Sequence, residues 1–241
     1  MKIIALMGVL LICGGLLGCG ATPTSRSMAS ARIRVVAKPR AGAVEPIARV
    51  ATYDSAPAPA KPSGTFEHVD YASLDNIVLW IEAPAGTVET TRPADKAIDV
   101  NADQPSSKIL PVSRRQTVRV RNSSSHTVSL YSVSDGNEFD LPSIRPGESA
   151  TFAAKSEGLI EILADPAKPP VALVYVAPSA HVAVARSGET IVFRDIPPGD
   201  GRLVTWHPRL PGSDRPLPLI AGRVSNVTIT IGVNTISDSS R

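Results

Sequence analysis

The chain has 241 residues, of which 43% are hydrophobic, 20% charged and 4% aromatic, and its formal net charge is +3. Its basic residues are scattered and few aromatic rings accompany them, which argues against a nucleic-acid-binding surface. The two cysteines are Cys13 and Cys19. Any folded region that follows them must therefore be stabilised by burial rather than by disulfide bonds.

The first residues have the pattern of a cleaved secretory signal. Lys2 precedes an apolar run that ends at Leu17, and this run is shorter than the roughly 20 apolar residues that a membrane-spanning helix needs. The sequence LLGC at residues 16–19 resembles the lipobox of bacterial lipoproteins. The resemblance implies removal of residues 1–18 and acylation of Cys19, with palmitate among the chains, which would anchor the protein to a membrane. The alternative is an ordinary signal in which Cys19 is incidental.

The resemblance to lipoproteins also implies a location: in a Gram-negative host, Gly20 would favour the periplasmic face of the outer membrane over retention at the inner membrane.

The segment after the signal is expected to be a tether. Residues 19–64 are poor in large apolar side chains and contain alternating prolines at 57–62, which predicts a flexible tether. Within it, Arg32–Val36 alternates like a strand that could dock on the folded body.

From Asn76 onward, short β-branched runs are separated by Pro, Gly, Asn and Asp, which is typical of an all-β sandwich or barrel. No stretch has a sustained helical period. The turns at 145–147 and 197–201 combine proline with glycine, so Gly147 and Gly199 are expected to hold a positive φ. The predicted strands cover residues 77–82, 108–111, 116–121, 127–132, 149–153, 158–163, 171–176, 181–185, 190–194, 202–206 and 224–232.

Three segments, taken together and in order, carry a resemblance to a known family. Residues 98–122 include KILPV and QTVRVRN, residues 139–149 read FDLPSIRPGES, and residues 193–208 contain FRDIPPG and LVTWHP. They resemble bacterial proteins with a plastocyanin-like (cupredoxin) domain, often labelled methylamine-utilisation-like. The third segment also resembles carboxypeptidase-regulatory-like, transthyretin-like modules.

The resemblance implies an all-β fold in which a Greek-key cupredoxin-like sandwich is accompanied by a second small β-sandwich module. In the resembling proteins, the copper domain is inserted between the first strands of the small module and the rest of it. The implied order is a signal peptide at 1–18, a tether at 19–64, the first strands of the small β-domain at 65–94, a cupredoxin-like domain at 95–178, the transthyretin-like remainder at 179–234 and a disordered tail at 235–241.

The copper ligands of the family are a His, a Cys, a second His and a Met. Here only the first has a counterpart, His126, because the loop that would carry the other three reads ADPAKPP over residues 164–170. Blue copper requires a cysteine sulfur, and the mature chain contains none besides Cys19. The sequence therefore excludes the family's electron-transfer role, and no cofactor is expected.

Other metal sites have little support in the sequence. The four histidines are far apart and lack the close spacing of metal-binding pairs; they are His68, His126, His181 and His207. A metal role for His126 is the alternative to a loop imidazole that faces solvent. One loop gathers oxygen ligands that could bind Ca²⁺, although without the spacing of a known loop; these are Asp135, Asn137, Glu138 and Asp140.

No catalytic motif is found, which predicts a protein that is not an enzyme. The first hypothesis is a membrane-anchored envelope lipoprotein whose cupredoxin-like body acts as a binding or structural module, with another envelope protein as a possible partner. The first alternative is a periplasmic metal-handling protein that uses His126. The second is a carbohydrate- or peptidoglycan-binding module, for which Trp80 and Trp206 are the available stacking rings, although burial in strands is the expected fate of both.

Overall fold

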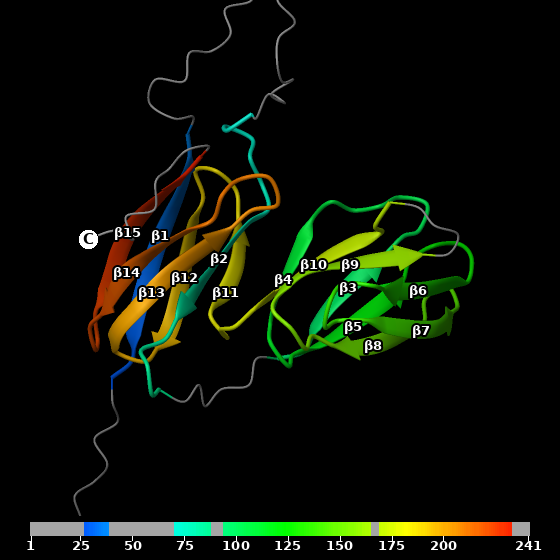
Figure 1. Cartoon of the computed structure of the whole chain (residues 1–241), viewed down its shortest axis with the longest axis horizontal. Helices are drawn as coiled ribbons and strands as arrows, with labels where there is room; N and C mark the ends of the chain where they lie inside the picture. The colour runs from blue at the N-terminus through cyan, green and yellow to red at the C-terminus, as the bar shows by residue number, and fades with distance from the viewer. Residues whose placement is uncertain (1–26, 39–69, 88–93, 165–168, 233–241) are drawn as a thin grey trace, which may run out of the picture.

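The computed structural model describes residues 27–38, 70–87, 94–164 and 169–232. Every regular element within these ranges is a β-strand (Figure 1), so the predicted all-β fold class is confirmed. None of the described residues form a helix that is long and apolar enough to span a bilayer. Cys19, His68 and the tail predicted at 235–241 lie outside the described residues.

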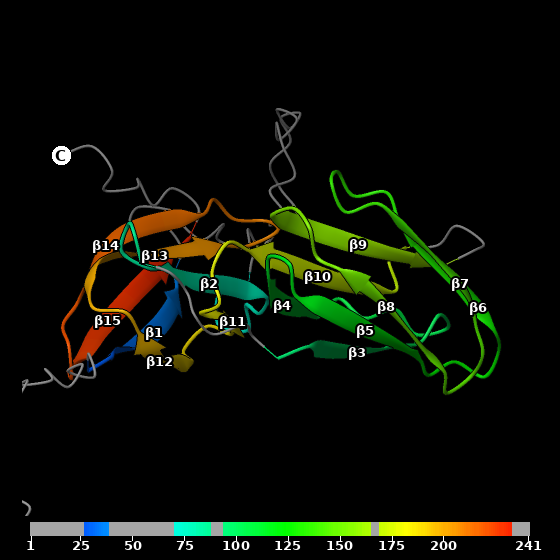
Figure 2. The same cartoon turned by 90° about the horizontal axis from the view of Figure 1, so that it is seen from below.

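The strands form two units that lie side by side, as Figures 1 and 2 show from two directions. The first unit contains β1 (Ala29–Ala37), β2 (Ile77–Glu82), β11 (Val182–Ala185), β12 (Thr190–Ile196), β13 (Gly199–Trp206), β14 (Ser213–Leu219) and β15 (Val224–Ile231). The second contains β3 (Lys96–Val100), β4 (Ile109–Ser113), β5 (Thr117–Asn122), β6 (Val128–Ser132), β7 (Phe139–Ile144), β8 (Ser149–Ala153), β9 (Gly158–Ala164) and β10 (Ala172–Ala177). In the chain, the second unit is thus inserted between β2 and β11 of the first.

The first unit is a sandwich of a three-stranded sheet, β12-β1-β15, and a four-stranded sheet, β11-β2-β13-β14. The side chains of β1 show how the sequence specifies this packing. Ala31, Ile33 and Val35 are fully buried on one face, and Arg32 and Arg34 are exposed on the other, as the two-residue period of a strand requires. The core between the sheets includes Ile33, Ile77, Leu79, Ile81, Ile196, Leu203, Leu217 and Ile231.

β1 is the central strand of its sheet. It pairs antiparallel with β12 and parallel with β15, so that Ile33 lies opposite Ile191 on one side and Val227 on the other. The flexible tether predicted over residues 19–64 is therefore wrong for residues 29–37, and the predicted strand Arg32–Val36 lies inside β1. The polar and proline-rich residues on both sides of this strand favoured a tether, whereas the alternation within the strand itself indicates a buried apolar face.

The second unit is a sandwich of a five-stranded sheet, β4-β10-β9-β6-β7, and a three-stranded sheet, β3-β5-β8. The chain crosses between the sheets, as in a Greek-key sandwich: β3 and β5 pair in parallel in one sheet, while β4, between them in sequence, pairs in parallel with β10 in the other. The two sheets enclose a separate core that includes Val112, Val118, Val120, Leu130, Ile160, Ile162, Val174 and Val176.

Three strands have no counterpart in the pattern of predicted strands, and all three lie at sheet edges. They are β3, β7 and β14. An edge strand can contain proline, because one row of its N–H groups has no partner strand. β7 accordingly contains Pro142, and β14 contains Pro216 and Pro218. These prolines and the charged residues near them weaken the β signal while protecting the edge against pairing with other chains.

Both turn glycines hold the predicted positive φ, at 81° for Gly147 and 137° for Gly199, but their surroundings differ. A Cβ at Gly147 would meet no atom within 4 Å, whereas one at Gly199 would lie 2.8 Å from Cγ of Pro84. We therefore expect Gly147→Ala to lower the free energy of unfolding by about 1 kcal/mol through backbone strain alone. Gly199→Ala should cost about 2 kcal/mol, because a rigid proline ring must also move. Chemical denaturation of both variants tests this order, and equal losses would contradict it.

The two units pack against each other through an aromatic cluster. Trp80 of β2 and Trp206 of β13 flank Tyr175 of β10, with ring centroids 5.8 Å and 4.4 Å from the Tyr175 ring. Burial, with a smaller contribution from the Glu157 carboxylate, raises the pKa of Tyr175 to about 12, so the phenol stays neutral at physiological pH. Aliphatic side chains complete this junction: Val78, Ile109, Leu159, Leu173, Ala177, Val182, Val184 and Val204.

Hydrogen bonds from two side chains reinforce the junction. Asn76, which precedes β2 and has a φ of 58°, accepts a bond from the Ile109 amide at 3.0 Å and donates one to the Ser107 carbonyl at 2.9 Å. Asparagine tolerates this left-handed conformation better than most residues. On the returning connection, Ser179 Oγ donates to the Ile81 carbonyl at 2.6 Å. The two sandwiches are thus joined by directional bonds as well as by apolar packing.

Candidate functional site

The candidate site suggested by the sequence lies at one end of the second unit. The connection from β5 to β6 carries His126, and β9 ends nearby at Ala164. In the ladder between β6 and β9, Leu130 lies opposite Ala164. Since β6 begins two residues before Leu130, the connection that holds His126 extends past the last residue of β9. The fold therefore brings His126 to the end of the second unit at which β9 ends.

His126 itself is half exposed and has one acidic neighbour. Its Nδ1 lies 3.6 Å from Oδ2 of Asp103, and the exposed fractions of the two side chains are 51% and 53%. Asp103 was not singled out from the sequence, because 23 residues separate it from His126 and no short motif links them. A polar contact this exposed contributes little to stability.

The loop around His126 is held by the side chain of Asn122. This asparagine is fully buried; its Nδ2 donates to the carbonyls of His126 at 2.8 Å and Ile144 at 2.9 Å, and its Oδ1 accepts from the Ser124 amide at 2.8 Å. Ser124 Oγ in turn accepts from the Ala102 amide at 2.9 Å. The buried side chains of Asn122 and Ser124 therefore satisfy backbone groups that the turn would otherwise leave without partners. An asparagine before a run of serines is a turn signal that could have indicated this role.

Ala164 ends β9 and begins the loop 164–170, which the sequence resemblance pairs with the copper-ligand loop of the resembling proteins. Its methyl group is buried, with 2% exposure, and residues 165–170 supply no Cys, His or Met by sequence. Residues 165–168 lie outside the described part of the chain. Among the described residues, no cluster of three or more His, Cys, Asp or Glu side chains could hold a metal ion. The donors present do not fit a blue copper centre, which needs a thiolate and two imidazoles.

The acidic loop suggested as a Ca²⁺ site uses its asparagine internally. Asn137 is buried, and its Oδ1 accepts hydrogen bonds from the amides of Lys155 and Ser156 at 2.8 Å and 3.1 Å. Its oxygen therefore supports a neighbouring turn and is not presented to an ion. Asp135, Glu138 and Asp140 are exposed, and Oε1 of Glu138 accepts from the Gly136 amide at 3.1 Å.

The other described histidines belong to the first unit and do not join His126. His181 precedes β11 and contacts Phe193 edge to face at 6.4 Å between centroids. His207 is buried, its Nδ1 accepts from the Arg209 amide at 3.1 Å, and burial lowers the pKa of its imidazole. It borders a cleft of about 450 Å³ that Asp75 and Arg209 also line. The structure thus places His181 and His207 in the first unit and His126 in the second.

Trp80 and Trp206 are not presented as stacking platforms for a sugar. Both face Tyr175 in the junction, where Trp80 is 8% exposed and Trp206 is half-buried. The expectation that these rings are buried in strands is met by Trp80 and in part by Trp206. Both rings pack against Tyr175 where the two units meet. Among the described residues, they therefore do not form the exposed aromatic surface that would favour a carbohydrate-binding module.

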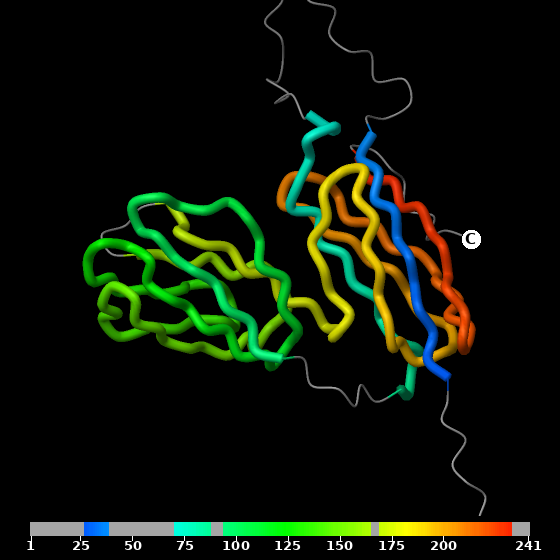
Figure 3. Tube along the Cα trace, turned by 180° about the vertical axis from the view of Figure 1, so that it is seen from behind, coloured from blue at the N-terminus to red at the C-terminus, as the bar shows by residue number. Residues whose placement is uncertain are grey.

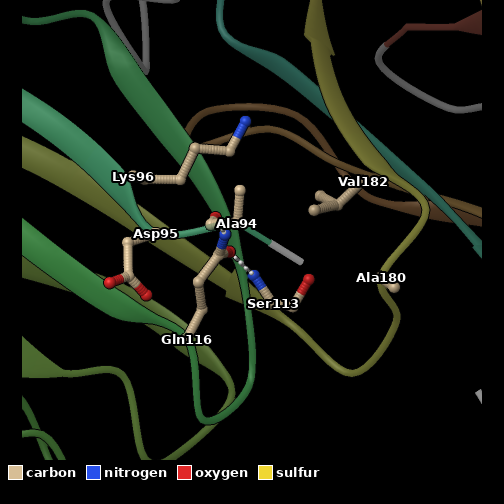
Figure 4. Close-up of a pocket in the computed structure, with 7 residues that line it drawn as sticks. All are labelled: Ala94, Asp95, Lys96, Ser113, Gln116, Ala180 and Val182. Atoms are coloured by element: carbon tan, nitrogen blue, oxygen red, sulfur yellow. Dashed lines mark hydrogen bonds between the residues drawn. The ribbon is translucent and has the colours of Figure 1, made fainter. Parts of the chain in front are cut away.

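A small cavity of about 210 Å³ lies where the start of β3, the turn after β4 and the segment before β11 meet (Figure 4). Gln116 is buried beside it, accepting from the Ser113 amide at 2.8 Å and donating to the Ala94 carbonyl. Ser113 Oγ is buried without a hydrogen-bond partner among the described residues. The cavity has room for water that could satisfy this hydroxyl. It contains no pair of nucleophile and base, and no sequence motif marks its position.

Comparisons with known proteins do not assign the chain to a family. No protein-family model matches it, and no curated protein matches its sequence. Solved structures similar to it include a purple cupredoxin from Nitrosopumilus maritimus, at 18% identity and a TM-score of 0.29 over 34% of this chain and 100% of the other. A mutant of amicyanin in its Cu(I) form matches at 18% identity and a TM-score of 0.28, over 41% and 98% of the two chains. A second amicyanin mutant, in its reduced form, matches at 16% and 0.28, over 43% and 100%.

Proposed function

We propose that this protein is a lipid-anchored component of a bacterial cell envelope, whose all-β body is a non-catalytic binding or structural module. The observation that carries the proposal is the order of features at the N-terminus. An apolar signal ends in LLGC at residues 16–19, and the first described strand, β1, begins ten residues later at Ala29. Acyl chains on Cys19 would hold such a body at a membrane without a spanning helix.

The junction between the two sandwiches supports the structural part of this proposal. Trp80, Tyr175 and Trp206 are the kind of large rings that binding surfaces often present, but here they bury one unit against the other. Asn76 and Ser179 add directional hydrogen bonds across the same boundary. The chain uses its aromatic surface to fix the geometry of an elongated body, which suits a spacer or a scaffold for an envelope partner.

The anchor is tested by metabolic labelling of the full chain in a bacterial host with radioactive palmitate. We expect the wild-type protein to incorporate label and Cys19→Ser to incorporate none, because the acyl group is proposed to need this residue. Cys13→Ser is the matched control, since it removes the chain's other cysteine from within the signal, and its labelling should equal that of the wild type. Equal labelling of wild type and Cys19→Ser, or no labelling of either, would overturn the proposed anchor.

A metal-handling role is the second candidate, and the proximity of His126 to Asp103 is the observation that favours it. One imidazole and one carboxylate leave most coordination positions of Cu²⁺ or Zn²⁺ to solvent or a partner, so we expect weak binding. After loading with either ion and extensive washing, elemental analysis of the full chain should find far less than one ion per molecule. One ion per chain, lost in His126→Ala and Asp103→Ala but kept in His181→Ala, would instead establish this second role.

A further inference from the structure

The tip of the first unit is the end at which β1 begins, and four segments of unusual composition form it. They are residues 27–28, the turn 83–87 after β2, residues 197–199 up to the first residue of β13, and residues 220–224 up to the first residue of β15. In these four described segments the sole ionisable side chain is Arg223, although 20% of the whole chain is charged. The loops themselves therefore carry little charge, although Glu82 and Asp200 directly flank them.

Contacts between these segments show that they form one surface. The Gly222 amide donates to the Met28 carbonyl at 3.1 Å, and the Ser30 amide donates to the Arg223 carbonyl at 3.0 Å. The positive-φ turn at Gly199 lies against Pro84. Figure 1 shows the tip as the lower end of the left-hand unit, where β1 begins, and Figure 3 shows the same end from behind.

Large apolar side chains are exposed on this tip. Met28 is 41% exposed, Ile220 52% and Val224 50%, which makes them three of the five large hydrophobic residues exposed in the described part of the chain. Exposed apolar side chains that gather in one place mark an interaction surface more often than scattered ones do. Acids also border the tip: Glu82, whose carboxylate lies 3.5 Å from the Arg202 guanidinium, and the exposed Asp195 and Asp200.

The length of the chain before β1 indicates what covers this surface. Cys19 and Ser27 are eight residues apart, and eight extended residues span at most about 28 Å. A tether over all of residues 19–64 would have spanned about 160 Å and left the body free of the membrane. Because β1 is the central strand of a sheet, the usable tether is only the short segment before it. Residues 20–26 contain one charge, that of Arg26, and no acid.

We propose that the tip formed by Met28, Ile220, Arg223 and Val224 docks on the lipid bilayer, so that the protein stands on the membrane through its first unit. This inference rests on the proposed acylation of Cys19. The short tether keeps the tip at high effective concentration near the membrane, the three apolar side chains enter the interface, and Arg223 meets lipid phosphates. Val133, which follows β6, belongs to the second unit and is not part of this tip.

The test places a single environment-sensitive fluorophore on cysteines introduced at exposed apolar positions. The folded part of the chain has no cysteine of its own, so labelling is specific once Cys19 carries lipid. Ile220→Cys probes the tip, Val224→Cys repeats the probe at a second site, and Val133→Cys, which is 71% exposed in the β6–β7 hairpin, is the matched control. The acylated full-length proteins are reconstituted into vesicles of phosphatidylethanolamine and phosphatidylglycerol that contain a nitroxide-labelled lipid.

We expect the label at 220 and 224 to emit at shorter wavelength and to be quenched several-fold more strongly than the label at 133. Co-flotation with vesicles reports the anchor separately. If the protein floats with the vesicles but the labels at 220 and 224 report an aqueous environment, the docked tip is overturned while the anchor remains. Equal quenching at 133 would also overturn it, because the body would then lie flat. Protein that fails to float would overturn the anchor, and with it this inference.

Discussion

Asn122→Ala is expected to lower the free energy of unfolding by about 3 kcal/mol or more, one of the largest losses from a polar side chain in this protein. The amide of Asn122 satisfies the carbonyls of His126 and Ile144 and the amide of Ser124, and alanine would leave these three backbone groups without that partner. Each buried group left unsatisfied costs about 1–3 kcal/mol. Thermal melting should show a fall of roughly 6 °C or more for a chain of this size.

The matched control for this prediction is Asn101→Ala in the same unit. Asn101 is only half-buried, and its Oδ1 accepts one hydrogen bond, from the Asp103 amide at 3.0 Å. Its replacement should cost no more than about 1 kcal/mol. Similar losses for the two variants would show that the hydrogen bonds of Asn122 do not stabilise the conformation of the β5–β6 connection.

Tyr175→Ala is expected to separate the unfolding of the two sandwiches. Each unit has its own core, so it is the packing at the junction that makes them unfold together. Truncating a buried aromatic residue costs about 3–5 kcal/mol, and here the loss falls on both units because Trp80 and Trp206 lose their contacts with the ring. Differential scanning calorimetry should show one transition for the wild type and two for the variant.

Tyr131→Ala controls for the loss of a tyrosine from the second unit alone. Tyr131 lies on β6, is half-buried, and has Asp140 and Leu163 as its strand partners, so it makes no contribution to the junction. We expect a smaller loss of about 1 kcal/mol and a single transition. A single transition for Tyr175→Ala, with a loss no larger than that of Tyr131→Ala, would show that the junction does not couple the units.

Strict alternation predicted the strands that have one buried face. β15 is an example, because the buried Ile229 and Ile231 alternate with exposed threonines, and the two-residue period alone indicates which side chains point inward. β14 is the opposite case, since its prolines are compatible with a strand only at a sheet edge. A local pattern contains no information on where an edge falls, because that depends on which other strands pair.

The candidate site was predictable only where its residues are close in sequence. His126 was found through its resemblance to a ligand, and the absence of a second ligand in residues 164–170 could be read directly. Asp103 could not be found, because it meets His126 through the packing of two loops from different strands. Similarly, burial of Trp80 followed from its strand, but its partner Tyr175 is 95 residues away and belongs to the other unit.

The position of β1 also has a consequence for the order of folding. The first described strand, β1, lies between β12 and β15, and its parallel partner β15 is the last of the described strands. Contacts between residues so far apart in sequence form slowly, because a long loop must close before they contribute. The second unit, continuous in the chain from β3 to β10, can fold without these distant contacts. The sheet that contains β1 is complete only when β15 has joined it, so we expect the first unit to become protected after the second.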